Sequence, residues 1–145
     1  MSDNYSLIIK NGTCNIDSKL TKVDLGLSGN KIKKIGKIEL NSSKVFDASN
    51  KVVLPGIIDT QVHFREPGST DAEDLESGSR AAVLGGVTAL FEMPNTNPPT
   101  SNLVEFDKKL QAAKNRMHSN YAFYFGATPD NTCLLYTSPS PRDRG

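Results

Sequence analysis

The chain of 145 residues carries 17 lysine and arginine residues against 16 aspartate and glutamate residues, so its formal net charge at pH 7 is +1. This balance lacks the basic footprint of a nucleic-acid-binding protein, and we expect no nucleic-acid partner. No apolar run approaches the roughly 18 residues of a membrane-spanning helix, and no secretion signal opens the chain. We therefore expect a cytoplasmic protein without a membrane partner.

Residues 1–53 show short apolar runs that predict β-strands separated by turns. Leu7–Ile9 is the first run, and we expect Asn11-Gly12 to end it as a turn. Over Val23–Leu27 apolar residues alternate with polar ones, which is typical of a strand with one buried face. Three further runs predict strands in the same way: Ile32–Ile38, Val45–Asp47 and Val52–Leu54. Because no helix accompanies them, these strands cannot bury both faces of a sheet by themselves.

A buried strand and a helix are predicted next, in a second region that covers residues 54–131. Apolar and β-branched residues predict the strand over Gly56–Phe64. Thr70 and Glu73 have the spacing of a capping box, so we expect a helix that begins near Thr70. Gly85-Gly86 is typical of the end of a helix.

The alternation continues with another strand, another helix and a third strand. Val87–Met93 is apolar and β-branched enough for a buried strand. Asn102 offers a helix N-cap, with Glu105 three residues later, and Tyr121–Phe125 predicts the third strand. The helix face expected to be buried repeats at helical spacing: Leu103, Phe106, Leu110, Ala113 and Met117. This alternation is typical of a parallel sheet in an α/β fold.

Residues 132–145 differ in character from the rest of the chain. They are rich in proline, serine and arginine and show no helical or strand period. DNA resembling the transposase adaptor of short-read sequencing libraries can encode the string from Cys133 to Asp143, so we expect a non-native tail outside the fold. The alternative is a flexible natural tail. Without this tail Cys14 is the only cysteine, which excludes an intrachain disulfide and fits a reducing compartment.

Three side chains that suit metal and anion binding lie at the end of the first strand of the second region. Gln61, His63 and Arg65 are spaced by two, and in an extended strand such residues point to the same side. An imidazole beside a guanidinium suggests a site for a metal and an anionic substrate. Active groups commonly lie at the C-terminal ends of strands in enzymes built on parallel barrels.

This segment resembles the amidohydrolase superfamily and, within it, the dihydroorotase family. The pattern Asp-x-His-x-His-x-Arg-Glu-Pro-Gly is matched by Asp59, His63 and Arg65–Gly68. Gln61 stands where the first metal-binding histidine is expected. The resemblance extends from about Tyr5 to Asn131. It implies an α/β fold, namely the N-terminal part of a metal-dependent hydrolase (β/α)8 TIM barrel preceded by strands of a small β-sandwich.

The resemblance also implies that the chain is truncated. A closed barrel of eight units needs about 250 residues, whereas about 75 lie between Gly56 and Asn131. We expect strands of the β-sandwich domain at 1–53, the first β/α units of the catalytic barrel at 54–131, and the tail at 132–145. Apolar surface facing the barrel would then lack a partner, so we expect the chain not to fold stably alone.

A zinc site with one or two ions is implied by the resemblance. His63 is the expected ligand, because a neutral imidazole binds zinc well; the alternative is a histidine with a structural hydrogen bond. A carboxamide oxygen is a poorer zinc ligand. Gln61 therefore binds the metal weakly, acts through water, or marks a loss of catalysis. The general base and the other ligands would lie downstream, so no catalytic residue is assigned within this chain.

Two residues are expected to bind the substrate. Arg65 can hold a carboxylate through two charge-assisted hydrogen bonds; the alternative is a surface salt bridge to Glu66 or Asp71. In the family, the asparagine of Met-Pro-Asn contacts the same carboxylate, and here that residue is Asn95. The alternative for Asn95 is an ordinary turn residue.

The activity implied by the resemblance is that of a dihydroorotase, the reversible cyclisation of N-carbamoyl-L-aspartate to dihydroorotate in pyrimidine biosynthesis. The chain alone would be inactive. An allantoinase- or hydantoinase-type cyclic amidase is an alternative, although allantoinases typically place asparagine at the position of Arg65. A non-catalytic scaffold for aspartate transcarbamoylase is a further alternative, which Gln61 favours. The expected partners are the small-molecule substrate and either a second copy of the protein or aspartate transcarbamoylase.

Overall fold

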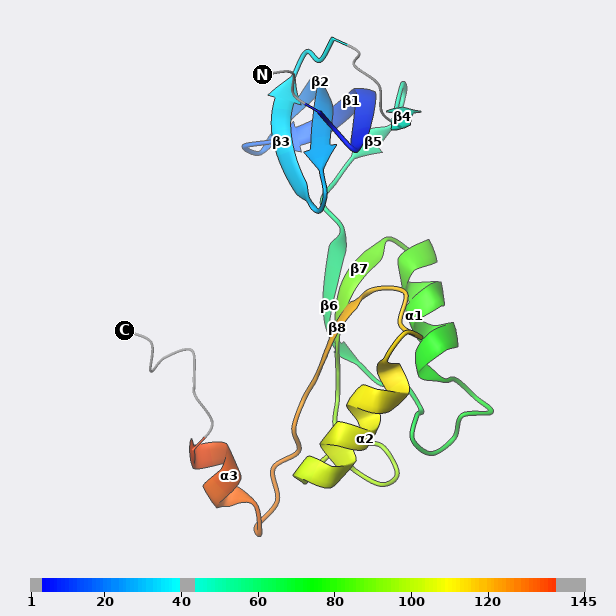
Figure 1. Cartoon of the computed structure of the whole chain (residues 1–145), viewed down its shortest axis with the longest axis vertical. Helices are drawn as coiled ribbons and strands as arrows, with labels where there is room; N and C mark the ends of the chain where they lie inside the picture. The colour runs from blue at the N-terminus through cyan, green and yellow to red at the C-terminus, as the bar shows by residue number, and fades with distance from the viewer. Residues whose placement is uncertain (1–3, 40–43, 138–145) are drawn as a thin grey trace. The chain divides into compact units, whose positions relative to one another are not determined.

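The computed structural model describes residues 4–39 and 44–137, without the side chains of residues 135 and 137. The chain divides into two compact units, Met1–Pro55 and Gly56–Gly145, and Figure 1 labels their elements. Residues 138–145 of the predicted tail lie outside the described residues. Over the first part of that tail the structure has a short helix, α3 (Thr132–Thr137), where the sequence predicted no helical period.

The first unit is a mixed β-sheet. Its strands are β1 (Leu7–Ile16), β2 (Lys19–Ser28), β3 (Lys31–Gly36), β4 (Lys44–Asp47) and β5 (Val52–Val53). The order is β3-β2-β1-β4, and β5 also pairs with β1. The β1–β2 and β2–β3 pairs are antiparallel, whereas β4 and β5 run parallel to β1. Strands therefore form where the apolar runs predicted them.

The prediction of a turn at Asn11-Gly12 is wrong. β1 continues through this dipeptide, which forms an irregularity in the register with β2 between Ile9 and Gly12. Asn11 has a φ of 60°, a left-handed conformation that asparagine tolerates. The turn lies instead at Asp17 and Ser18, whose φ angles of 47° and 63° suit a tight hairpin.

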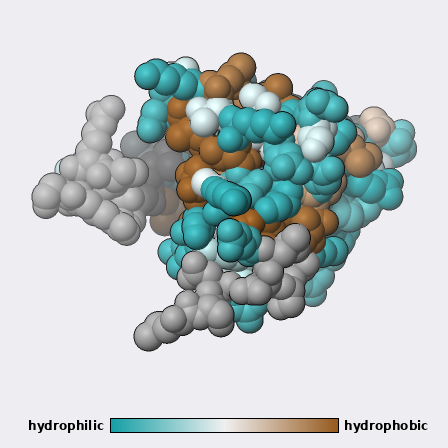
Figure 2. Space-filling view, turned by 90° about the horizontal axis from the view of Figure 1, so that it is seen from above, coloured by the Kyte–Doolittle hydropathy of each residue, from teal (hydrophilic) through white to brown (hydrophobic). Residues whose placement is uncertain are grey.

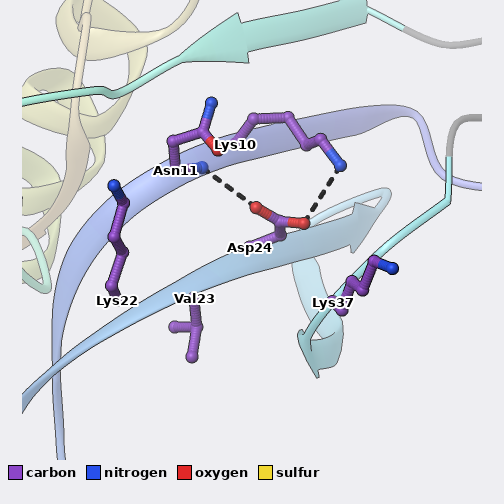
Figure 3. Close-up of a pocket in the computed structure, with 6 residues that line it drawn as sticks. All are labelled: Lys10, Asn11, Lys22, Val23, Asp24 and Lys37. Atoms are coloured by element: carbon purple, nitrogen blue, oxygen red, sulfur yellow. Dashed lines mark hydrogen bonds and ion pairs between the residues drawn. The ribbon is translucent and has the colours of Figure 1, made fainter.

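Asp24 of β2 explains why the chain bulges instead of turning (Figure 3). Its carboxylate accepts hydrogen bonds from the backbone N–H of Asn11 (2.9 Å) and of Ile38 (3.0 Å), and Lys10 Nζ lies 3.0 Å away. Burial raises the pKa of Asp24, but these hydrogen bonds and the Lys10 charge bring it below its ordinary value. A buried, paired carboxylate thus connects β1, β2 and the segment after β3.

Hydrophobic packing in the first unit centres on Tyr5, Ile8 and Ile38. Ile32 and Ile35 of β3 remain 56% and 50% exposed, although the apolar pattern grouped them with Ile38. Figure 2 likewise shows hydrophobic surface that reaches solvent among hydrophilic residues. The sheet therefore buries only part of its apolar side chains.

The second unit contains three parallel strands in the order β6-β7-β8, with helices between them. The elements are β6 (Ile57–Val62), α1 (Leu75–Leu84), β7 (Val87–Glu92), α2 (Leu103–Ala113) and β8 (Asn120–Phe123). In Figure 1 α1 and α2 lie on one side of the strands. Buried residues from the loop after β6 and from α1, β7 and α2 form one core: Phe64, Leu75, Leu90 and Ala113. The predicted alternation and parallel pairing are confirmed.

The predicted start of the first helix is wrong by several residues. Asp74, not Thr70, is the N-cap of α1, and its side chain accepts the N–H of Ser77 at 2.7 Å. The hydroxyl of Ser77 accepts a hydrogen bond from the N–H of Asp74, so these two residues form the capping box. The helix ends at Gly85, as predicted.

The predicted N-cap of α2 is confirmed, but its predicted buried face is partly wrong. Asn102 accepts the N–H of Glu105 at 2.9 Å. Leu103, expected in the core, is 59% exposed, whereas Lys109 is only 2% exposed. The buried face of α2 therefore includes Lys109 in place of Leu103. In the part of the chain described, no helix is long and apolar enough to cross a membrane.

Candidate active site

The loops after β6 and β7 leave the same edge of the sheet, because the two strands are parallel neighbours. This arrangement brings together two residues that the sequence singled out. His63 follows β6 and Asn95 follows β7, and His63 Nδ1 lies 2.8 Å from Asn95 Oδ1. An amide oxygen only accepts hydrogen bonds, so this contact places the imidazole proton on Nδ1 and leaves Nε2 free to bind a metal.

The alternating pattern predicted for Gln61, His63 and Arg65 continues past the end of the strand. β6 stops at Val62, so only Gln61 belongs to it. Phe64 is buried in the core, while His63 and Arg65 on either side of it are exposed. The backbone N–H of Gln61 donates to Asp59 Oδ1 at 3.0 Å. Because Phe64 is buried, the side chains of its neighbours His63 and Arg65 point away from the core.

Arg65, two residues after His63 in the loop that follows β6, is an exposed cation. Within residues 4–39 and 44–137 its guanidinium makes no ion pair or hydrogen bond. The alternative of a salt bridge to Glu66 is wrong, because Glu66 binds Arg116 instead. The same holds for Asp71, which pairs with no cation in the part of the chain described. Arg65 is therefore available to an anionic ligand.

A backbone hydrogen bond joins the two loops a second time. The N–H of Asn97 donates to the carbonyl of Pro67 at 3.0 Å. Gly68 has a φ of +130°, and a Cβ atom at this position would lie 3.4 Å from both Asn97 Cβ and Arg65 O. A side chain at Gly68 would therefore be strained by the backbone conformation, although the second loop leaves room for its Cβ atom.

Glu66 is the anchor of the loop after β6. Arg116 Nη1 and Nη2 lie 2.6 Å and 2.9 Å from its two carboxylate oxygens, and the N–H of Leu75 donates to it at 3.0 Å. Burial raises the pKa of Glu66, but the guanidinium and the N–H lower it below its ordinary value. This carboxylate is therefore ionised, and both of its oxygens already accept hydrogen bonds.

A different ion pair supports the loop after β7. Glu92, the last residue of that strand, is fully buried, and Lys109 Nζ of α2 lies 2.8 Å from its Oε2. Among the described residues neither oxygen of Glu92 accepts a well-aligned hydrogen bond. Burial raises the pKa of Glu92 to about 7 despite the Lys109 charge, which acts in the opposite direction. The sequence prediction missed this pair, and it explains why α2 turns a lysine inwards.

Lys109 also reaches the loop that carries Asn95. Its Nζ lies 3.4 Å from Thr100 Oγ1, which lies 3.4 Å from Thr96 Oγ1. Thr96 in turn donates to the carbonyl of Pro98 at 2.9 Å. Because Thr96 follows Asn95 directly, these contacts connect the buried pair to the exposed edge of the site.

Fold and site together define a class of protein, a β/α fold with polar groups at the C-terminal ends of its parallel strands. The sequence profile of the amidohydrolase family matches residues 52–141. The chain belongs to this family, and the predicted fold class, the N-terminal part of an α/β TIM barrel preceded by β-strands, is confirmed. Cyclic amide hydrolases are the relatives found in both sequence and structure.

Individual relatives fall into three activities. The chain is 40% identical over 126 residues to a dihydroorotase of Lactobacillus gasseri, covering 86% of this chain and 29% of that protein. It is 40% identical over 120 residues to the mitochondrial allantoinase of Aquarana catesbeiana, covering 80% of this chain and 25% of that protein. The solved L-hydantoinase of Arthrobacter aurescens is similar with a TM-score of 0.82 and 29% identity, over 91% of this chain and 30% of that one. The chain thus spans less than a third of these relatives.

The amidohydrolase family is metal-dependent, so the described residues can be tested for a fit to a metal. His63 fits this role, because Asn95 holds its Nδ1 and its Nε2 is free. Gln61 is a weaker donor of oxygen type. Over residues 4–39 and 44–137 there is no group of three or more His, Cys, Asp or Glu side chains able to hold a metal ion. One imidazole is therefore a fitting but incomplete ligand set for a catalytic metal, which takes three protein ligands.

Proposed function

We propose that the chain is the N-terminal part of a dihydroorotase, which converts N-carbamoyl-L-aspartate and dihydroorotate into one another in pyrimidine biosynthesis. The observation that carries this proposal is the exposed guanidinium of Arg65, which has no partner among the described residues and lies two residues after His63, the residue that contacts Asn95. Both dihydroorotate and carbamoyl-aspartate carry a carboxylate that such a guanidinium binds. Below, the proposed longer protein is called the complete enzyme.

Each residue has a distinct task in the proposed reaction. Arg65 binds the substrate carboxylate, and the exposed Asn95 adds a hydrogen bond to it or orients His63. His63 holds the metal through Nε2, with Gln61 beside it as a weak or water-mediated ligand. The proposed metal is zinc, as one or two ions, which when bound polarises the ring carbonyl and lowers the pKa of a bound water molecule. We place the general base outside this chain.

A substrate comparison tests the proposal. The complete enzyme, loaded with zinc, is assayed with dihydroorotate, allantoin and hydantoin, and its metal content is measured. We expect the highest kcat/KM for dihydroorotate and a lower zinc content in His63→Ala. Turnover of allantoin in preference to dihydroorotate would show that the assignment within the family is wrong.

Two other functions have an observation in their favour. Allantoinase is supported by the 40% identity to the Aquarana catesbeiana enzyme, which equals that of the dihydroorotase from Lactobacillus gasseri. Arg65 argues against it. A non-catalytic scaffold for aspartate transcarbamoylase is supported by Gln61, and absence of turnover on all three substrates would favour it. A homo-oligomer, a complex with aspartate transcarbamoylase and a cytoplasmic location stay predictions.

A further inference from the structure

We infer that Arg116 is a positioning residue that holds the substrate-binding Arg65 in place by clamping its neighbour Glu66. This inference rests on the proposed role of Arg65. Arg116 and Glu66 are 50 residues apart in the sequence, and Arg116 lies in the turn after α2. None of the motifs in the sequence points to it.

The clamp is anchored at both ends. On one side, Arg116 Nη1 donates to the carbonyl of Ala112 at 3.1 Å, and the backbone N–H of Arg116 donates to Ala113 at 3.1 Å. On the other side, the guanidinium binds both oxygens of Glu66 and lies 3.4 Å from Asp74, the N-cap of α1. A guanidinium with partners on α2, on the loop and at the start of α1 has little freedom to move.

The turn after α2 brings Arg116 to this position. α2 ends at Ala113, and Asn115 has a φ of 61°, the left-handed conformation that commonly follows a helix. Arg116 therefore folds back along the last turn of its own helix, towards the start of α1. A residue that simply continued the helix would point elsewhere.

The clamp acts on Arg65 through the backbone. Glu66 is fixed by Arg116 and by the N–H of Leu75, and Pro67 is fixed by the N–H of Asn97. The two residues that follow Arg65 are thus each held by contacts with other elements, while the Arg65 side chain itself remains exposed. The loop backbone is therefore fixed next to Arg65, whereas the guanidinium of Arg65 is accessible to a ligand.

Glu66 itself is unsuited to proton transfer. Its oxygens accept from Arg116 and Leu75, and its pKa lies below the ordinary value. Glu66 of the Arg-Glu-Pro-Gly segment therefore helps to position the preceding Arg65.

Kinetics and hydrogen exchange of the complete enzyme test this inference, with Arg116→Met as the main variant. Arg80→Met is the matched control, because Arg80 lies on the exposed side of α1 in a long surface contact of 3.5 Å with Glu76. We expect KM for dihydroorotate to rise about tenfold in Arg116→Met with kcat little changed, since lost binding common to ground and transition states appears in KM. Amide exchange in the peptide spanning residues 64–70 should accelerate in the same variant and remain unchanged in the control.

The outcomes separate this inference from the proposed function. Failure of the wild type to turn over dihydroorotate would contradict the proposed function alone, because the exchange experiment does not need a substrate. Unchanged exchange in Arg116→Met would overturn the inference, and so would faster exchange with unchanged KM. If Arg116→Met does not fold, Arg116→Lys keeps the charge without the two-pronged contact. In that variant we expect a smaller rise in KM, and an unaltered KM with unaltered exchange would overturn the clamp.

Discussion

The loops after β6 and β7 are both held by an ion pair between a glutamate and a cation near or on α2, yet the two pairs are built differently. Glu66 and Arg116 are partly exposed, with side chains 16% and 36% accessible, and each oxygen of Glu66 has a hydrogen-bond donor. Glu92 and Lys109 are fully buried, and the described residues give Glu92 no aligned hydrogen bond. The first pair stabilises the charged glutamate, whereas the second leaves it poorly solvated.

The pKa values of the two carboxyl groups record this difference. The pKa of Glu66 is lowered by Arg116 and Leu75, against the effect of burial, and the pKa of Glu92 is raised by burial to about 7. A similar pair of residues can therefore make opposite contributions to stability as the pH changes. The direction of each pKa shift depends on whether the hydrogen bonds and the opposite charge outweigh the effect of burial, which they do at Glu66 and do not at Glu92.

The largest effect is expected when the buried pair is broken. Lys109→Met leaves Glu92 buried without a cation, which typically costs about 3–5 kcal/mol in unfolding free energy. Urea unfolding of the complete enzyme at pH 8 would measure this loss. Lys108→Met is the matched control: Lys108 is exposed and forms a surface ion pair with Glu105, so its removal should cost about 0.5 kcal/mol or less.

A second substitution sharpens the same test. Adding Glu92→Leu to Lys109→Met removes the stranded charge and should recover most of the lost stability, because apolar residues often replace a buried pair without cost. If Lys109→Met alone unfolds at the same urea concentration as Lys108→Met, the description of Glu92 as a buried charge is wrong.

A pH effect of intermediate size separates the two loops. Because the folded-state pKa of Glu92 is raised, its contribution to stability is present below pH 4.5 and is lost as the pH rises towards 7. This loss amounts to at most about 1.4 kcal/mol per pH unit. Glu66, with its lowered pKa, behaves in the opposite way, and its contribution is lost as the pH falls below 4.5.

Unfolding free energies measured from about pH 2.5 to 8 check these opposite slopes. Glu92→Gln should flatten the decline between pH 4.5 and 7, and Glu66→Gln should flatten the loss on acidification. Parallel curves for the wild type and both variants would contradict the contrast between the loops.

The smallest effect is expected at Thr100, which links Lys109 to the loop of Asn95. Thr100→Val keeps the shape of this buried side chain and removes the hydroxyl that lies 3.4 Å from both Lys109 Nζ and Thr96 Oγ1. We expect a loss of about 1 kcal/mol and faster amide exchange at residues 95–98. Exchange at residues 64–70 should stay unchanged, because the other loop has its own clamp.

Local patterns predicted what depends on local interactions. The strands of the second unit, the Asn102 cap and the helix end at Gly85 follow from periodicity and short-range capping. The start of α1 was misplaced because Thr70 and Asp74 both suit a cap. Glu66, which binds the N–H of Leu75 from nine residues earlier, supports the second choice.

Contacts between distant residues account for the other errors. Asn11-Gly12 has the sequence of a turn, but Asp24 of the next strand binds Asn11 and keeps β1 extended. Lys109 occupies a core position because Glu92 lies opposite it, and helical periodicity records only hydrophobicity. Short motifs single out His63, Arg65 and Asn95 as candidate site residues, whereas Arg116, 50 residues from Glu66, carries no such signal.

The most direct test of the account is the kinetic effect of Arg65 itself. In the complete, zinc-loaded enzyme, Arg65→Met should lower kcat/KM for dihydroorotate at least about tenfold, since it removes a charge-assisted contact with the carboxylate worth about 1.5–3 kcal/mol. Arg80→Met, which removes an exposed guanidinium from α1, should leave kcat/KM unchanged. Equal kcat/KM values for Arg65→Met and the wild type would contradict the placement of a carboxylate site at the ends of β6 and β7.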